Sequence, residues 1–188
     1  MKKIFSIVVI ALCFNLVLTS CSDDDDNGNV VVNTDTISKV FEIESSFRFD
    51  NKLGWVINGE LRPALIKGDH LLIYRLSAVT GSNQDVWQLI PRTFYLDLDN
   101  DGITESEFSY DYDFSIEDFN IYAGGNYDLA LTPNLIDKQV FRIVIIPGSS
   151  SGNAFNSKSS IDYHDYNAVI NYYHINDDKV KKLQPIIK

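Results

Sequence analysis

The sequence predicts an all-β fold, an antiparallel β-sandwich of seven or eight strands with a short C-terminal helix. Short apolar or alternating runs recur from residue 40 onward, and clusters of Gly, Pro, Asn, Asp and Ser separate them. One segment near the C-terminus instead spaces its apolar side chains with a helical period. We therefore expect one folded domain at residues 38–188, which is long enough to build a hydrophobic core.

The predicted strands are short runs rich in aliphatic, β-branched and aromatic residues. The run at 71–76 is almost continuously apolar, as expected for a central strand, and Pro91 marks a break between two others. The dipeptide Asn58-Gly59 directly follows one run and favours a hairpin turn there. The predicted strands lie at residues 40–43, 55–57, 71–76, 86–90, 94–98, 108–114 and 140–146.

Residues 94–114 predict a β-hairpin whose register can be derived. A three-residue loop at Asn100, Asp101 and Gly102 sets Phe94 opposite Phe108 and keeps two alternating apolar stripes on one face. A two-residue loop would turn one stripe to the other side of the sheet. Gly102 then occupies the left-handed position that closes such a loop.

Residues 162–175 predict the C-terminal helix, with Asp162 as its N-cap. The side chains of Tyr163, Tyr166, Ile170 and Tyr173 fall close to one face of that helix. Residues 149–160 precede it and are rich in Ser, Asn and Gly, which indicates a loop.

The N-terminus predicts export and a lipid anchor. Lys2 and Lys3 precede an apolar stretch at residues 4–18, which is shorter than the ~20 residues that cross a bilayer as a helix. Leu18-Thr19-Ser20-Cys21 resembles a lipobox, the processing signal of bacterial lipoproteins. This resemblance implies a signal peptide at residues 1–20 and acyl chains on Cys21. Two or more acyl chains hold a protein stably on a bilayer.

Residues 21–37 predict an acidic flexible tether. The run from Ser22 to Asp26 repels itself and keeps the domain off the lipid surface. It also resembles the export signal that takes many Bacteroidota lipoproteins to the outer face of the outer membrane; a plain acidic spacer is the alternative. Asp35-Thr36-Ile37 resembles an O-glycosylation site of the same bacteria, which would place a glycan on Thr36.

Composition excludes several classes of function. Removing residues 1–20 leaves 14 Lys and Arg against 26 Asp and Glu, a net charge of −12, so nucleic acid is not an expected partner. Cys13 leaves with the signal peptide and Cys21 carries lipid, so the folded domain has no cysteine for a disulfide, a thiol nucleophile or a metal site.

The sequence also resembles a group of small uncharacterised lipoproteins of flavobacteria and their relatives, over roughly residues 40–172. The resemblance rests on the apolar runs at 40–43, 72–76, 85–93 and 141–147. Some members carry a collagen-like stretch after the lipidated cysteine, which this chain replaces with its Asp run. The resemblance implies a β-rich fold and carries over no activity.

No catalytic motif stands out, and we expect a non-enzymatic domain that binds a glycan or another protein. His70 is expected in an exposed turn, and the neighbours His164 and Asp165 would not face each other on a helix. Carboxylate pairs such as Asp111 with Asp113 keep open an alternative, a polysaccharide hydrolase. Trp87 is expected in the core, whereas Trp55 is the better candidate for an exposed, sugar-stacking aromatic. The pairs Glu42 with Glu44 and Glu117 with Asp118 fall under the same hydrolase alternative, and His174 suggests no further chemistry.

One segment predicts a structural calcium site. Asp97, Asp99 and Asp101, followed by Gly102, Ile103 and Glu105, match the first nine positions of an Asp-x-Asp-x-Asp-Gly loop. The candidate ligands are the carboxylates of Asp97, Asp99, Asp101 and Glu105 and the carbonyl of Ile103. The hairpin register places Asp97 across from Glu105, where like charges destabilise a sheet unless a cation neutralises them. Phe108 stands where an EF-hand needs a bidentate Glu, so a solvated acidic turn is the alternative.

Overall fold

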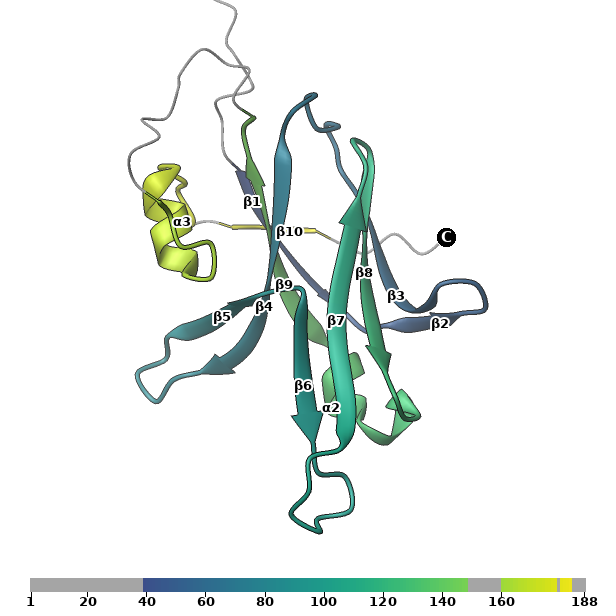
Figure 1. The fold of residues 1–188 in the computed structure, drawn as a ribbon. Helices are drawn as coiled ribbons and strands as arrows, with labels where there is room; N and C mark the ends of the chain where they lie inside the picture. Colours follow the sequence, from purple (N-terminus) through teal and green to yellow (C-terminus); the bar gives the residue numbers. More distant parts are fainter. Residues whose placement is uncertain (1–38, 149–159, 179, 184–188) are drawn as a thin grey trace, which may run out of the picture. The chain divides into compact units, whose positions relative to one another are not determined.

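The computed structural model describes residues 39–148, 160–178 and 180–183, all within a compact unit, Thr34–Lys188. Two five-stranded sheets make up this unit (Figure 1). Four predicted features lie outside the described residues. They are the predicted signal peptide at 1–20, the predicted lipidation site Cys21, the predicted tether at 21–37 with Thr36, and nearly all of the predicted loop at 149–160.

The first sheet, sheet A, has the order β10-β1-β9-β4-β5, and the second, sheet B, has the order β2-β3-β8-β7-β6. All neighbouring strands are antiparallel except β10, which runs parallel to β1. The strands of sheet A are β10 (Lys181–Leu183), β1 (Lys39–Ser45), β9 (Gln139–Ile146), β4 (His70–Val79) and β5 (Asp85–Leu89). Those of sheet B are β2 (Arg48–Asp50), β3 (Gly54–Glu60), β8 (Asp118–Gly125), β7 (Ser106–Phe114) and β6 (Arg92–Leu96).

The all-β sandwich with a short C-terminal helix is confirmed, and the seven predicted strands all form. The described residues contain ten strands rather than seven or eight, because β2, β8 and β10 add to the predicted set. β2 and β10 have only three residues each and carry little sequence signal. β8 is a central strand, and its buried residues Phe119, Ile121 and Ala123 do alternate with partly exposed ones.

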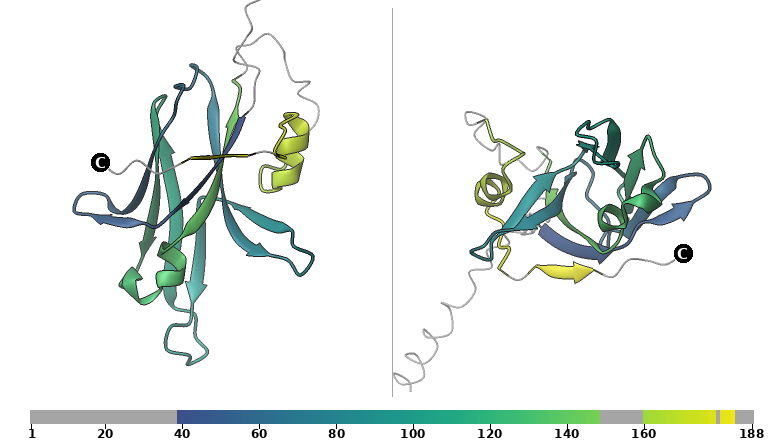
Figure 2. Two further views of the ribbon diagram at one scale, coloured as in Figure 1. Left: turned by 180° about the vertical axis from the view of Figure 1, so that it is seen from behind. Right: turned by 90° about the horizontal axis from the view of Figure 1, so that it is seen from below.

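The main core lies between the inner faces of the two sheets, where large aromatic and aliphatic side chains meet. Burying one such side chain contributes about 1.5–3 kcal/mol, so this core is the main source of stability. One end is covered by the 3-10 turn η2 (Leu129–Leu131) and the one-turn helix α2 (Pro133–Ile136), which bury Leu129 and Ile136 in the same core (Figure 2). The most deeply buried members include Ile73, Phe108, Phe119, Phe141 and Ile143.

The C-terminal helix α3 (Tyr166–Tyr172) is shorter than the predicted 162–175. Its N-cap is Asp165 rather than Asp162, because the Asp165 carboxylate accepts a hydrogen bond from the Ala168 N–H. Tyr163 thus precedes the helix, and Tyr166, Val169 and Ile170 form its buried face. That face packs on the outer side of sheet A in a second, smaller core.

The predicted turn at Asn58-Gly59 is wrong, because both residues lie inside β3 and pair with β8. Gly59 serves packing instead: a Cβ at this position would overlap the ring of Phe119, its ladder partner. A glycine within a strand often marks such a close approach.

The hairpin register is confirmed, and the loop length is corrected. Phe94 pairs with Phe108 as predicted, but the ladder ends at Leu96 and Ser106. The connection therefore spans residues 97–105 rather than three residues, so Asp97 and Glu105 are not a ladder pair. Gly102 does take a positive φ, 88°.

Candidate functional site

The loop at residues 97–105 brings three of the predicted calcium ligands together. Oxygens of the Asp97, Asp99 and Asp101 carboxylates lie within 4.8 Å of one another. Asp99 and Asp101 are exposed and Asp97 is partly buried. Carboxylates at this separation repel one another, and a cation among them would remove that repulsion.

Backbone hydrogen bonds hold this loop in its curled conformation. The Asp97 carboxylate accepts from the N–H of Asp101 at 3.1 Å and from the N–H of Gly102 at 2.8 Å. The Asp101 carboxylate accepts from the N–H of Ile103 at 2.8 Å. Asn100 and Gly102 both have positive φ angles, 61° and 88°, which bend the chain back toward Asp97. The alternating aspartates therefore converge instead of pointing to opposite sides.

Glu105 does not join the three aspartates in the structure. Its backbone carbonyl accepts from the side-chain amide of Asn126, whose oxygen accepts in turn from the Glu107 N–H. This clamp fixes the base of the loop. Calcium takes six to eight oxygens, so the three aspartates are a partial ligand set. The Ile103 carbonyl and the Glu105 carboxylate remain predicted ligands.

A second feature is a row of polar side chains across the outer face of sheet B. The Asn58 amide donates to the Asn120 side-chain oxygen at 2.6 Å, and the Asn120 amide donates to Asp113 at 2.9 Å. The Tyr122 hydroxyl donates to the other oxygen of Asp113 at 2.7 Å. Desolvation, together with the hydrogen bond to Asp113 and its charge, raises the pKa of Tyr122 to about 12. We call Asn58, Asp113, Asn120 and Tyr122 the polar row.

The ladder explains why the polar row lies on one face. Asp113 pairs with Asn120, Asn58 pairs with Asn120 from the other side, and Asp111 pairs with Tyr122. Side chains of directly paired residues project to the same face of a sheet. By the same alternation Tyr95, which is 63% exposed, projects to this face from β6.

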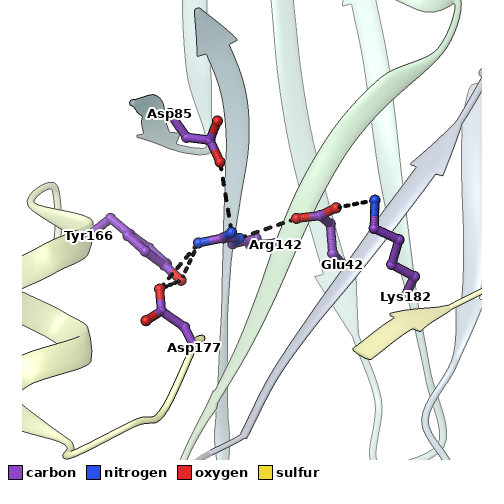
Figure 3. A network of polar contacts seen from close by, with 6 residues as sticks. All are labelled: Glu42, Asp85, Arg142, Tyr166, Asp177 and Lys182. Atoms are coloured by element: carbon purple, nitrogen blue, oxygen red, sulfur yellow. Dashed lines mark hydrogen bonds and ion pairs between the residues drawn. The ribbon is translucent and has the colours of Figure 1, made fainter. Parts of the chain in front are cut away.

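Helix α3 packs on the outer face of sheet A, where Arg142 forms ion pairs with several carboxylates. The Arg142 guanidinium contacts Glu42 at 3.3 Å, Asp177 at 3.2 Å, Asp85 at 3.8 Å and the Tyr166 hydroxyl at 2.8 Å (Figure 3). It also stacks 4.2 Å from the Trp87 ring centroid. This cluster joins α3 and the segment after it to the sheet, and we assign it a structural role. Trp87, predicted to lie in the core, is partly buried and packs against the smaller core.

The remaining sequence candidates do not form a catalytic constellation in the described part of the chain. His70, His164 and His174 are all exposed. His70 begins β4 rather than lying in a turn, and His164 and His174 lie in turns on either side of α3 rather than within a helix. Trp55 was predicted to be exposed, but it is half-buried against the main core, and its neighbour Phe49 is the exposed aromatic of that hairpin at 64%. Sequence reasoning missed Asn58 and Asn120, because Asn58 was assigned to a turn and β8 was not predicted.

Comparisons with protein-family models, with curated proteins and with solved structures give no match. The helices among the described residues are all too short or too polar to span a membrane. The fold and its sites thus define the protein as a β-sandwich with an acidic loop at one hairpin tip and a polar outer sheet.

Proposed function

We propose that the chain is a lipid-tethered, non-enzymatic domain at the outer face of the outer membrane that binds a glycan across the outer face of sheet B. The polar row carries this proposal, because its four side chains hold one another in place while their remaining donors and acceptors face outward. A hydroxyl-rich ligand needs donors and acceptors in fixed positions, and groups that are already ordered lose little entropy on binding.

Two further observations favour a glycan over an apolar partner. Tyr95 and Tyr122 offer aromatic rings beside the amides and carboxylates, a combination that suits the mixed apolar and hydroxyl faces of a sugar. The face carries Asp111 and Asp113 as acceptors for sugar hydroxyls, whereas the other sheet is covered by α3. A protein partner is the competing outcome of the test below.

The predicted location agrees with this function. The lipobox at Leu18 to Cys21, two or more acyl chains on Cys21 and the acidic tether would hold the domain at the cell surface, where extracellular polysaccharide is present. We further propose that calcium binds Asp97, Asp99 and Asp101 and stiffens the β6–β7 hairpin at the edge of the binding face.

The experiment is a glycan array probed with the compact unit, Thr34–Lys188. Binding to a defined glycan should weaken by about tenfold in Asp113→Ala, which removes the acceptor shared by Asn120 and Tyr122. Glu44→Gln is the matched control, because it removes a carboxylate from β1 in the other sheet. Equal loss in both variants, or an empty array, would overturn the proposal.

A panel of chromogenic glycosides tests the hydrolase alternative on the same protein. Turnover by the wild type that is lost in Asp111→Asn or Asp113→Asn would replace binding with hydrolysis as the function. Capture of a specific surface protein that Asp113→Ala abolishes, without any glycan signal, would assign the face to a protein partner instead.

A further inference from the structure

Two arginines and one glutamine meet where the chain passes from sheet A to sheet B. Arg75 lies in β4, Gln88 in β5 and Arg92 at the start of β6, and residues 90 and 91 connect the last two strands. β5 and β6 are edge strands of their sheets. In Figure 1, and in the view from behind in Figure 2, β5 and the end of β4 diverge from β6. This edge of the domain is distinct from the polar row.

Arg75 is held in a fixed orientation by its neighbours. Its Nε donates to the Gln139 side-chain oxygen at 2.9 Å, and its guanidinium carbon lies 4.9 Å from the Tyr110 ring centroid. Gln139 is itself buried and donates to the carbonyls of Asn134 and Asp137. The guanidinium therefore loses little conformational freedom when it binds a ligand.

Arg92 approaches the same aromatic ring as Arg75. The two guanidinium carbons lie 5.6 Å and 5.9 Å from the Phe94 centroid, for Arg92 and Arg75 respectively. Within the described residues, neither arginine has a carboxylate within 4.0 Å, although the chain has 26 acidic residues. Arg142, by contrast, contacts three carboxylates. Both guanidinium groups thus lie beside the Phe94 ring without a carboxylate partner, and an anion at this ring would interact favourably with either cation.

Gln88 supplies an independent observation at the same place. It pairs directly with Arg75 in the β4–β5 ladder, so both side chains project to the same face. Its side-chain oxygen is buried and accepts no hydrogen bond within the described part of the chain. A buried acceptor without a donor is uncommon in folded proteins and calls for a partner.

We propose that Arg75 and Arg92 bind the carboxylate of an acidic saccharide, and that the Gln88 amide turns outward to accept a hydrogen bond from a hydroxyl of the same sugar. Guanidinium groups present forked N–H donors that match a carboxylate, and such charge-assisted hydrogen bonds are about twice as strong as neutral ones. A hydroxy acid supplies both the anion for the arginines and the donor for Gln88. The site lies apart from the polar row, so it can be tested without the proposed function.

Calorimetric titration of the compact unit with glucuronate tests this site, with glucose and inorganic sulfate as comparison ligands. Glucuronate should bind and glucose should not. Arg92→Gln should weaken glucuronate binding about tenfold, because it removes one charge-assisted contact. Arg62→Gln is the matched control, since Arg62 is exposed and already paired with Glu60. Equal affinity for glucuronate in both variants, or none in the wild type, would overturn the proposal.

A second variant separates loss of binding from loss of fold. Gln88→Glu places a carboxylate opposite Arg75, where it would occupy the site internally. We expect this variant to melt at a higher temperature than the wild type and to lose glucuronate binding. Unchanged glucuronate affinity in Gln88→Glu would contradict the site. Equal affinity of the wild type for sulfate and for glucuronate would contradict the saccharide assignment.

Discussion

Replacing Arg142 with alanine should be among the most destabilising single changes in the domain. The Arg142 side chain is only 14% exposed, and so is that of its partner Glu42. Removing the cation leaves the Glu42 and Asp177 carboxylates, which approach Arg142 from opposite sides, without their shared partner (Figure 3). It also removes the stacking partner of Trp87 and the donor to Tyr166.

The expected loss follows from burial and contact geometry. Removing one partner of a buried ion pair costs about 3–5 kcal/mol, because the remaining charge stays desolvated and uncompensated. Lys182, which is exposed and lies 3.3 Å from the other Glu42 oxygen, offsets part of this cost. We therefore expect about 3 kcal/mol, which is a large share of the about 5–15 kcal/mol that a domain has. The melting temperature should fall by about 10 °C.

Urea denaturation of the compact unit, followed by tryptophan fluorescence, measures this free energy. Arg142→Lys should lose less than Arg142→Ala, because it keeps the charge but not the flat stacking surface or the forked donors. Arg62→Ala, at an 82% exposed side chain paired with Glu60, should cost no more than about 1 kcal/mol. A loss in Arg142→Ala as small as in Arg62→Ala would refute the reasoning.

Four further predictions concern the anchor, the acidic loop, the tyrosines and one glycine. Cys21→Ser should release the protein from the membrane fraction. Alanine at residues 23–26 should leave lipidation intact but protect the domain from protease added to whole cells. Unchanged digestion of that variant would show that the acidic run is only a spacer. Titration with millimolar calcium should show one site that disappears in Asp99→Ala. A flat titration, with an unchanged melting temperature in chelator, would contradict the proposed calcium site. The free energy of unfolding should fall as the pH rises above about 10, because burial raises the pKa of Tyr110 to about 12 while unfolded tyrosines lose their protons near pH 10. The stabilisation that Tyr110 contributes is therefore complete below the unfolded pKa and is lost as the pH rises through the folded pKa. Tyr110→Phe should flatten this pH dependence in urea denaturation at several pH values. Gly59→Ala should cost about 1–3 kcal/mol by overlapping Phe119, and Gly124→Ala, whose Cβ would meet only the Ser109 hydroxyl at 3.4 Å, should cost less; equal losses would contradict the packing argument.

The hairpin at residues 94–114 shows what sequence alone could predict. Alternating apolar side chains have a strict period of two, so only one loop parity keeps both stripes on the core, and the Phe94–Phe108 pair followed. The loop length did not follow, because the Asp97 carboxylate satisfies the backbone N–H groups of Asp101 and Gly102 in place of ladder bonds. The same hydrogen bonds curl the loop so that the carboxylates of the three aspartates converge.

Other features depend on tertiary contacts that a linear pattern does not contain. Asn58-Gly59 is a dipeptide that favours turns, yet both residues lie in β3 because the ring of Phe119 occupies the space next to Gly59. Asn58 donates a hydrogen bond to the side chain of Asn120 on β8. The Arg142 cluster draws residues from β1, β5, β9 and the segment after α3, so no local spacing could indicate it. Likewise, β5 separates Arg75 from Arg92 in the sequence, and only the folded chain places both near the ring of Phe94.

Amide chemical-shift mapping with a glycan selected from the array tests the central claim most directly. The account predicts that the largest shifts fall on β3, β7 and β8 around Asn58, Asp113, Asn120 and Tyr122, and that they vanish in Asp113→Ala. Shifts confined to other surfaces, or a pattern that Asp113→Ala leaves unchanged, would contradict binding on the outer face of sheet B.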